Sequence, residues 1–476
     1  MELQATFNQR RVIPVEEIIN KIAERFKRDA EEFLRGSRKD IAAAEEFFLP
    51  RLSQMCAELL SGLYEEADAV LAADREGRKR SGLVVERRGD GRQVLTRLGE
   101  VRFRRTYFQK RDGTYCYPID EQAGIREYER VSGGVSLELV ETAREVSYGK
   151  SSKLVTGGAV SRQTVMHKVR QSIAKVEVVE RRKVPVLHVD ADEDHVKRYG
   201  GGSTTAPLIV VYEGIEKQGK RGICKNDFRV SEYGESADEL WETALTELER
   251  RYDLTGTKIY LHGDGASWIK TGLNWLPNSV LVLDRYHVNK ALAASVSGIE
   301  RKYGCQYEYL LREALREGDK ERFLFVRNTL MNRWPEREKS VRENTDYLFT
   351  HFDAIHIWHV DAEARNGGAT EPHVSTVLSA RLSSRPMAWS EKTLKRMLPI
   401  LAAKDCELEP RQQEGTADED RPDSMGTVRP KKPRHSMGLP DPDLTVTIPG
   451  ASGKVTPLFN ALRPFICSRP FAPTTT

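Results

Sequence analysis

The sequence lacks any run of about 18 apolar residues, the length that a membrane-spanning helix needs, so we expect no membrane segment. Its N-terminus has no apolar signal core, and the cytoplasm is therefore the expected location. The six cysteines are far apart and form no Cys-x-x-Cys pair, which argues against a zinc knuckle and favours reduced thiols. The chain also lacks a large excess of one charge, because 75 basic residues oppose 71 acidic ones. A net charge of +4 excludes a histone-like protein and leaves room only for a local basic surface.

At 476 residues the chain is too long for one ordinary core, and about three domains are the first expectation. The residue pattern divides it further, into six segments of different character. These are a helical N-terminal region (1–92), a small β-sheet with a helix-turn-helix (93–180), the first part of an α/β core (181–298), an all-helical insertion (299–368), the last helix of the core (369–403), and a linker, disordered by composition, with a C-terminal tail (404–476).

Two acidic turns follow two β-rich runs in the middle of the chain. The run 258–262 ends at Gly263-Asp264-Gly265, where glycines let the backbone turn sharply and leave the carboxylate open. The run 280–283 ends at Asp284, which a helix containing His287 follows. Parallel strands that each end in a carboxylate form the edge at which α/β sheets bind ligands. For Asp284 alone, a helix N-cap is an equally good interpretation.

A third acidic run, VDADED, lies earlier, in a predicted strand over 184–192. Side chains alternate along a strand, so His188, Asp190 and Asp192 share one face. Adjacent carboxylates repel unless a cation neutralises them, and oxygen ligands suit Mg²⁺ or Mn²⁺. The alternative is an exposed acidic turn that binds no metal.

The predicted order of elements, three strands followed by alternating helices and strands, resembles that of the RNase H-like fold. In that fold the first and fourth strands are neighbours, which would bring Asp192 towards Asp264. Beyond the helical segment, Glu371 opens a further helix, where the helix dipole alone would favour an acid. Three carboxylates on such a sheet suit two-metal phosphodiester chemistry, in which the metals activate a hydroxyl and stabilise the leaving oxygen.

Two stretches of the N-terminal half predict contacts with DNA. Residues 136–175 have the pattern of a helix-turn-helix, whose last helix would carry a polar first turn into the major groove; an ordinary three-helix bundle is the alternative. The strands within 94–120 form either a basic platform for nucleic acid or a half-exposed sheet. The candidate DNA-binding residues are Arg162, Gln163, Thr164, Lys168 and Arg170 on the helix, with Arg102 and Arg104 on the sheet.

Four motifs together resemble bacterial insertion-sequence transposases of the ISLre type, in the Mutator-like DDE group. They are VDADEDHV (189–196), HGDGASWIK (262–270), VLDRYHVNK (282–290) and EPHVSTVLSARLSSRPMAWS (371–390). The resemblance implies Asp192, Asp264 and Glu371 as the catalytic and metal-binding acids, with Asp190 as a rival for the first. It further implies that Asp284 and His287 are a supporting Asp-x-x-His signature, and that the protein acts as a homo-oligomer.

The function expected from this resemblance is Mg²⁺- or Mn²⁺-dependent DNA cleavage at transposon ends, followed by strand transfer into target DNA. The DNA ends and the target DNA would be its partners, and bound protein would lie on the nucleoid. Two other interpretations stay open: a DNA-binding protein with a catalytically decayed core, and an RNase H-like nuclease that does not transpose.

Overall fold

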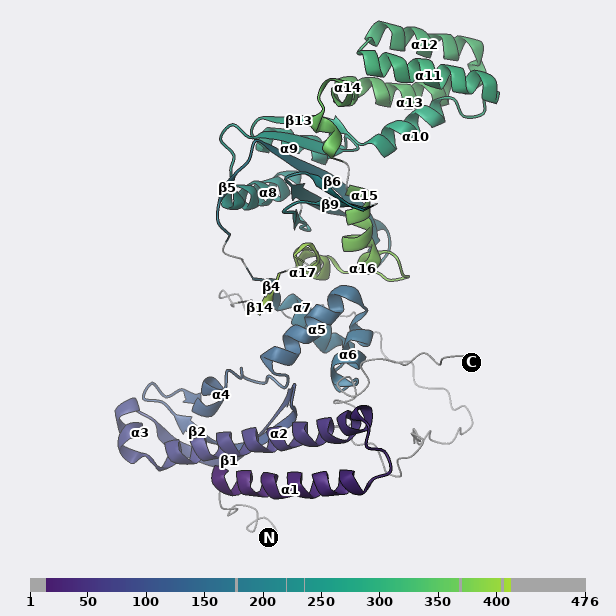
Figure 1. Ribbon diagram of the computed structural model, residues 1–476. Helices are drawn as coiled ribbons and strands as arrows, with labels where there is room; N and C mark the ends of the chain where they lie inside the picture. The colour runs from purple at the N-terminus through teal and green to yellow at the C-terminus, as the bar shows by residue number, and fades with distance from the viewer. Residues whose placement is uncertain are drawn as a thin grey trace, which may run out of the picture. The chain divides into compact units, whose positions relative to one another are not determined.

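The computed structural model describes residues 14–175, 179–219, 221–234, 236–367, 370–403 and 406–411. It is a mixed α/β structure, as predicted, and it consists of two compact units (Figure 1). Of the described residues, the first unit comprises those from 14 to 171 with 410 and 411, and the second comprises those between 172 and 409. Most of the predicted linker and tail, from 412 to 476, lies outside the described residues. Residues 408–410, which composition assigned to the linker, form a short strand, β14 (Leu408–Pro410).

The first unit is built from helices and one small antiparallel sheet of order β1-β2-β3. Its elements are α1 (Val15–Arg35), α2 (Ile41–Ala73), α3 (Arg75–Ser81), β1 (Val84–Thr96), β2 (Gly99–Gln109), β3 (Tyr115–Cys116), α4 (Pro118–Gln122), α5 (Gly133–Glu145), α6 (Tyr148–Thr156) and α7 (Arg162–Arg170). No described helix in the whole chain, including the 33-residue α2, is long and apolar enough to cross a membrane.

The alternation along β2 determines how α2 packs on the sheet. Val101 and Phe103 face α2 and are buried with Ala57 of that helix. At the same time α2 covers backbone donors of β2, because Asp68 accepts hydrogen bonds from both the amide (2.9 Å) and the hydroxyl (2.6 Å) of Thr106. A strand whose backbone donors are satisfied in this way does not offer them to another chain.

The second unit contains a five-stranded sheet of order β10-β7-β6-β12-β13. β7 and β10 run antiparallel to their neighbours, whereas β12 and β13 run parallel to β6. The strands of the unit are β4 (Ser172–Ala174), β5 (Arg182–Lys183), β6 (Val186–Lys197), β7 (Ser203–Tyr212), β8 (Ile215–Gln218), β9 (Arg221–Cys224), β10 (Phe228–Val230), β11 (Tyr252–Asp253), β12 (Lys258–Gly263), β13 (Ser279–Leu283) and β14.

Some helices of the second unit pack on this sheet, and others form a helical bundle beside it. They are α8 (Ala237–Arg251), α9 (Ser267–Trp275), α10 (Arg285–Ser295), α11 (Arg301–Glu317), α12 (Lys320–Arg333), η1 (Pro335–Arg337), α13 (Glu338–Thr350), α14 (Phe352–Val360), η2 (Glu363–Asn366), α15 (Thr370–His373), the π-helical η3 (Val374–Ser379), α16 (Ala380–Leu382) and α17 (Glu391–Ala402). The helical character predicted between 299 and 358 is confirmed, and α10 to α14 share one apolar core, to which Leu283 of β13 also belongs.

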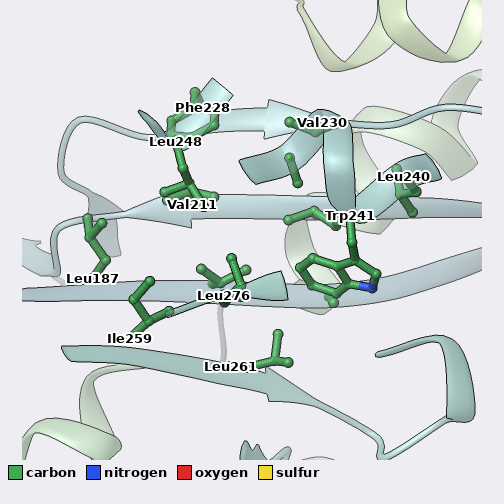
Figure 2. Close-up of a cluster of buried hydrophobic side chains, with 14 of the residues drawn as sticks. Leu187, Val211, Phe228, Val230, Leu240, Trp241, Leu248, Ile259, Leu261 and Leu276 are labelled. Carbon is green, nitrogen blue, oxygen red and sulfur yellow. The ribbon is translucent and has the colours of Figure 1, made fainter. Parts of the chain in front are cut away.

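One face of the sheet packs against an apolar core. Leu187 of β6 and Leu261 of β12 belong to it (Figure 2), and buried residues of α8 and α9 complete it. Trp241 of α8 is fully buried there and donates its indole N–H to the carbonyl oxygen of Trp268 at 2.7 Å. The side chains between these positions point to the opposite face, as the predicted alternation requires. That opposite face carries His188 and Asp190.

The close approach of α8 and α9 predicts a specific packing defect. A Cβ atom at Gly272 would lie 2.6 Å from the Trp241 ring, which is buried and cannot retreat. We expect Gly272→Ala to lower the free energy of unfolding by about 1–3 kcal/mol, measured by denaturant titration. Gly304→Ala is the matched control, because its Cβ would meet only ordinary contacts, the nearest at 3.6 Å. A Gly272→Ala protein as stable as the Gly304→Ala protein would contradict this packing.

Candidate functional site

Three acidic residues lie side by side at one edge of the five-stranded sheet. The pairing of β6 with β12 places Asp190 opposite His262, so Asp192 lies opposite Asp264 two residues further along. The pairing of β12 with β13 ends at Gly263 and Leu283, so Asp284 follows next to Asp264. Asp192, Asp264 and Asp284 therefore share the edge formed by the carboxyl ends of β12 and β13, where ligands bind in open α/β sheets.

The local sequence explains how Asp264 is presented. Gly265 has φ +84°, a left-handed conformation that turns the chain immediately after the strand. A side chain on Gly263 would lie 3.0 Å from the carbonyl oxygen of Ala191, so glycine permits the close approach of β12 to β6. One carboxylate oxygen of Asp264 accepts a hydrogen bond from the amide of Ala266 at 2.8 Å, which fixes the orientation of the side chain.

Asp284 is the N-cap of α10, as the alternative interpretation held. Its carboxylate accepts a hydrogen bond from the amide of Tyr286 at 2.6 Å. The cap role does not remove it from the site, because its charge acts on Asp192. Asp284 thus combines a structural role with a contribution to the negative charge of the edge.

The pKa of Asp192 lies above its usual range. Its pKa is raised to about 6, chiefly by burial and also by the charges of Asp264 and Asp284, while the amide of Glu193 and the charge of His287 lower it. Three neighbouring carboxylates form a site with an excess of negative charge. A divalent cation would relieve that repulsion, and carboxylate oxygens are the ligands that Mg²⁺ and Mn²⁺ prefer.

The structure separates the two candidates for the first acid, Asp190 and Asp192. Asp190 is fully buried and accepts a hydrogen bond from the hydroxyl of Tyr212 at 2.9 Å. Asp192 is partly exposed and lies at the edge with Asp264. The predicted strand also ended too early: β6 continues to Lys197, so the acidic run 190–194 is part of the strand and not a turn after it.

His287 projects from the first turn of α10 towards Asp192, whose pKa it lowers. Its Nδ1 atom is buried and has no hydrogen-bond partner among the described residues. The ring lies edge-on against Tyr286, with 5.3 Å between the ring centroids. A buried nitrogen of this kind next to an acidic pair is suited to contact a ligand of the site.

The position of the third predicted acid, Glu371, is described only for its backbone, and its side chain lies outside what the structure describes. The backbone belongs to α15, which packs against β6, the strand of Asp192. Among the described residues no group of three or more His, Cys, Asp or Glu side chains has the arrangement of a metal site. The described part of the site is therefore the carboxylate pair Asp192 and Asp264, flanked by Asp284 and His287.

Comparison with known proteins identifies the family. Residues 41–415 match the model of an uncharacterised protein family, UPF0236. A UPF0236 protein of Caldanaerobacter subterraneus subsp. tengcongensis is 36% identical over 351 residues, which cover 72% of this chain and 73% of the relative. A second from the same organism is 37% identical over 349 residues, with the same coverage. A UPF0236 protein of Streptococcus gallolyticus is 26% identical over 326 residues, 62% of this chain and 71% of the relative.

The chain belongs to the UPF0236 family. The assignment to ISLre-type, Mutator-like transposases was therefore wrong, since both the family model and the relatives carry the UPF0236 name instead. Two of the motifs behind that assignment, HGDGASWIK and VLDRYHVNK, lie at the ends of β12 and β13, where glycine and acidic residues recur for conformational and chemical reasons in unrelated α/β proteins.

The predicted DNA-binding residues of this UPF0236 chain differ in their exposure. On α7, Arg162 and Gln163 are exposed, and the hydroxyl of Thr164 lies 3.0 Å from that of Ser161. Two other side chains of the helix turn inward: Lys168 forms an ion pair with Glu129 at 2.6 Å, and Arg170 is buried. The sequence identifies the polar residues of a helix, but how the helix packs decides which of them face solvent.

The basic residues of β2 are partly neutralised within their own unit. Arg102 is exposed and forms an ion pair with Glu100 at 2.5 Å. Arg104 is more enclosed and pairs with Glu65 of α2 at 3.3 Å. Both guanidinium groups thus already have an acidic partner, which lowers the positive charge that this face offers to a phosphate backbone.

Two residues of the site were missed by sequence reasoning. His262 and His188 lie behind the acids, 3.1 Å apart between Nε2 and Nδ1, and both are almost fully buried. Burial lowers the pKa of His188 to about 4 and that of His262 to about 3, so both rings are neutral near pH 7 and one donates to the other. The available signal was the spacing. In each strand a histidine precedes an acid by two residues, His188 before Asp190 and His262 before Asp264, so both lie on the same face of the strand.

Proposed function

We propose that this UPF0236 protein is a DNA transposase that cleaves and joins DNA strands by a DDE, two-metal mechanism, with Asp192, Asp264 and Glu371 as its acids. The observation that carries the proposal is the register that aligns Asp192 with Asp264 on adjacent parallel strands. The strand order β10-β7-β6-β12-β13, in which β7 alone runs opposite to the other four strands, supports an RNase H-like core. The packing of α15 on β6 supports Glu371 as the third acid.

The donor chemistry of the site fits Mg²⁺ or Mn²⁺. Asp192 and Asp264 offer carboxylate oxygens. The pKa of Asp192 is raised mainly by burial and also by the negative charges of Asp264 and Asp284, and a cation would compensate those charges. When bound, the metal ions supply Lewis-acid activation of the attacking hydroxyl and stabilisation of the leaving oxygen. The protein holds these acids in place through the Ala266 amide at Asp264 and the Glu193 amide at Asp192.

The first unit would bind the DNA. In this proposal α5, α6 and α7 form a helix-turn-helix, and Arg162 and Gln163 read base edges from the exposed first turn of α7. Lys168 and Arg170 support the fold of this unit, as their inward contacts suggest. Two DNA ends must be held together for strand transfer, so the active form would be a homo-oligomer on DNA in the cytoplasm.

The names of the relatives favour transposition over plain nuclease activity. One UPF0236 protein of C. subterraneus carries a name that joins eleven locus designations, and another joins four. Several loci of one genome that encode the same protein are expected for a gene that has been copied within that genome. A nuclease with a housekeeping function does not require such copies.

The deciding experiment supplies the purified chain with the DNA that flanks its gene and a supercoiled target plasmid. We expect cleavage and joined products with Mg²⁺ and neither with EDTA. Cleavage without joined products would favour the RNase H-like nuclease, and sequence-specific binding without cleavage would favour the decayed DNA-binding protein.

The pKa of Asp192 predicts how metal binding depends on pH. A carboxyl whose pKa is raised to about 6 keeps its proton up to that pH, and the proton must leave before an ion binds. We expect Mn²⁺ affinity, measured by titration calorimetry, to fall about tenfold per pH unit below pH 6 and to level off above it. An affinity that stays constant between pH 7 and pH 5 would contradict a role for Asp192 as ligand.

A further inference from the structure

The helical insertion touches the acidic edge through Tyr347 of α13. The hydroxyl of Tyr347 donates a hydrogen bond to the backbone carbonyl oxygen of Asp264 at 2.7 Å. Burial raises the pKa of Tyr347, and the charges of Asp264 and Asp284 raise it further, which places the hydroxyl among the acids. A residue separated from Asp264 by most of the insertion thus contacts the same turn.

His351 follows Tyr347 by four residues, and its ring lies next to Gly265 in the Asp264-Gly265 turn. Its Nδ1 lies 2.9 Å from the carbonyl oxygen of Tyr347, and because a carbonyl can only accept, Nδ1 carries the proton. The Nε2 atom is buried, has no hydrogen-bond partner among the described residues, and faces Gly265. A Cβ atom at Gly265 would lie 2.3 Å from it. The Asp264-Gly265 turn is therefore enclosed by the hydroxyl of Tyr347 and the ring of His351.

The helix that carries both contacts is firmly anchored. Val341, Thr345 and Leu348 of α13 are fully buried in the insertion. Leu348 directly follows Tyr347, so the Tyr347 backbone cannot move without disturbing that core. The buried packing of α13 therefore holds Tyr347 rigidly, as a side chain that positions another must be held.

We propose that Tyr347 is a positioning residue of the acidic site: its hydrogen bond fixes the Asp264-Gly265 peptide and thereby the direction of the Asp264 carboxylate. The carboxylate is oriented by the amide of Ala266, which lies within the same turn. That amide belongs to the next peptide, Gly265–Ala266, so a change in the Asp264-Gly265 peptide displaces it through Gly265 and turns the carboxylate away from Asp192. The inference rests on the proposed function only where it concerns catalysis, because the geometry of the turn exists without metal or DNA.

The test compares Tyr347→Phe, which removes only the hydroxyl, with Tyr309→Phe. Tyr309 lies on α11 of the same insertion and is 59% exposed, so the loss of its hydroxyl should have no effect. Hydrogen exchange of peptides covering 259–270 is measured in the metal-free full-length chain, and Mn²⁺ binding is measured by calorimetry. For Tyr347→Phe we expect faster exchange in 259–270 only, and Mn²⁺ binding about tenfold weaker. The melting temperature should fall by no more than about 4 °C.

Two results would overturn the inference. One is unchanged exchange in 259–270, and the other is faster exchange throughout the second unit, which would show a general loss of stability. Failure of the proposed function appears differently, as a wild-type chain that binds Mn²⁺ but cleaves no DNA. In that case the exchange and Mn²⁺ measurements on Tyr347→Phe still decide whether the residue positions Asp264.

Discussion

Asp192→Asn and Asp264→Asn are each expected to reduce metal-dependent DNA cleavage by about a thousandfold or more, with DNA binding retained. Each substitution keeps the shape of the side chain but removes the negative charge that would hold a cation between two adjacent strands. The rate is measured on radiolabelled DNA across a Mg²⁺ titration, because weaker metal binding alone would be recovered at high Mg²⁺. Binding is measured separately by mobility shift.

Asp353→Asn provides the matched control. The Asp353 side chain is 84% exposed and pairs with Lys320 on the surface of the insertion, where an ion pair contributes little. Its substitution changes the net charge by the same amount as the test variants but should leave cleavage unchanged. Wild-type cleavage by either test variant, with a normal Mg²⁺ requirement, would show that these acids serve the fold and not the chemistry.

The acidic edge could be predicted from sequence because its determinants are local. Asp264 lies between two glycines after a β-rich run, and Asp284 occupies the corresponding place after the next run. Strand direction then brings both to the same edge, which follows from the parallel connection through a helix. The helical insertion could be predicted for the same reason, since its apolar residues recur with helical spacing over a long stretch.

The choice between Asp190 and Asp192 could not be made from sequence, because it depends on Tyr212 of another strand. Periodicity places both acids on one face, but only the β6–β7 pairing shows that the hydroxyl of Tyr212 binds Asp190. The same limitation applies to Lys168, whose partner Glu129 lies 39 residues earlier in the chain. Long-range partners of polar side chains are decided by packing, which a residue pattern does not encode.

Tyr347 was missed for a related reason. It belongs to a helix whose sequence is typical of a separate bundle, and its contact with Asp264 spans 83 residues. Its apolar neighbours indicate only that the helix is buried on one side. A tyrosine that directs its hydroxyl out of that core and into an acidic site becomes visible only in three dimensions.

The second large effect is expected from Gly367→Ala, four residues before Glu371. A Cβ atom there would lie 2.1 Å from Nε2 of His262. The backbone at Gly367 has φ −102° and ψ −177°, which alanine adopts freely, so the contact alone disfavours the substitution. His262 cannot yield, because it is almost fully buried and hydrogen-bonded to His188.

The segment that leads to Glu371 must therefore move in Gly367→Ala, and a displacement of about 1 Å at a catalytic acid typically costs about a hundredfold in rate. We expect that loss in cleavage assays, with circular dichroism unchanged.

The double variant His262→Ala with Gly367→Ala removes the crowding, because the ring that the new Cβ atom would meet is absent. The double variant should therefore cleave at nearly the rate of His262→Ala alone, a non-additivity that a double-mutant cycle measures. If Gly367→Ala cleaves at the wild-type rate, Glu371 does not depend on this contact, and the third acid must be sought elsewhere. If Gly367→Ala lowers the rate as much in the His262→Ala background as in the wild type, the loss comes from the fold and not from the crowding between Gly367 and His262.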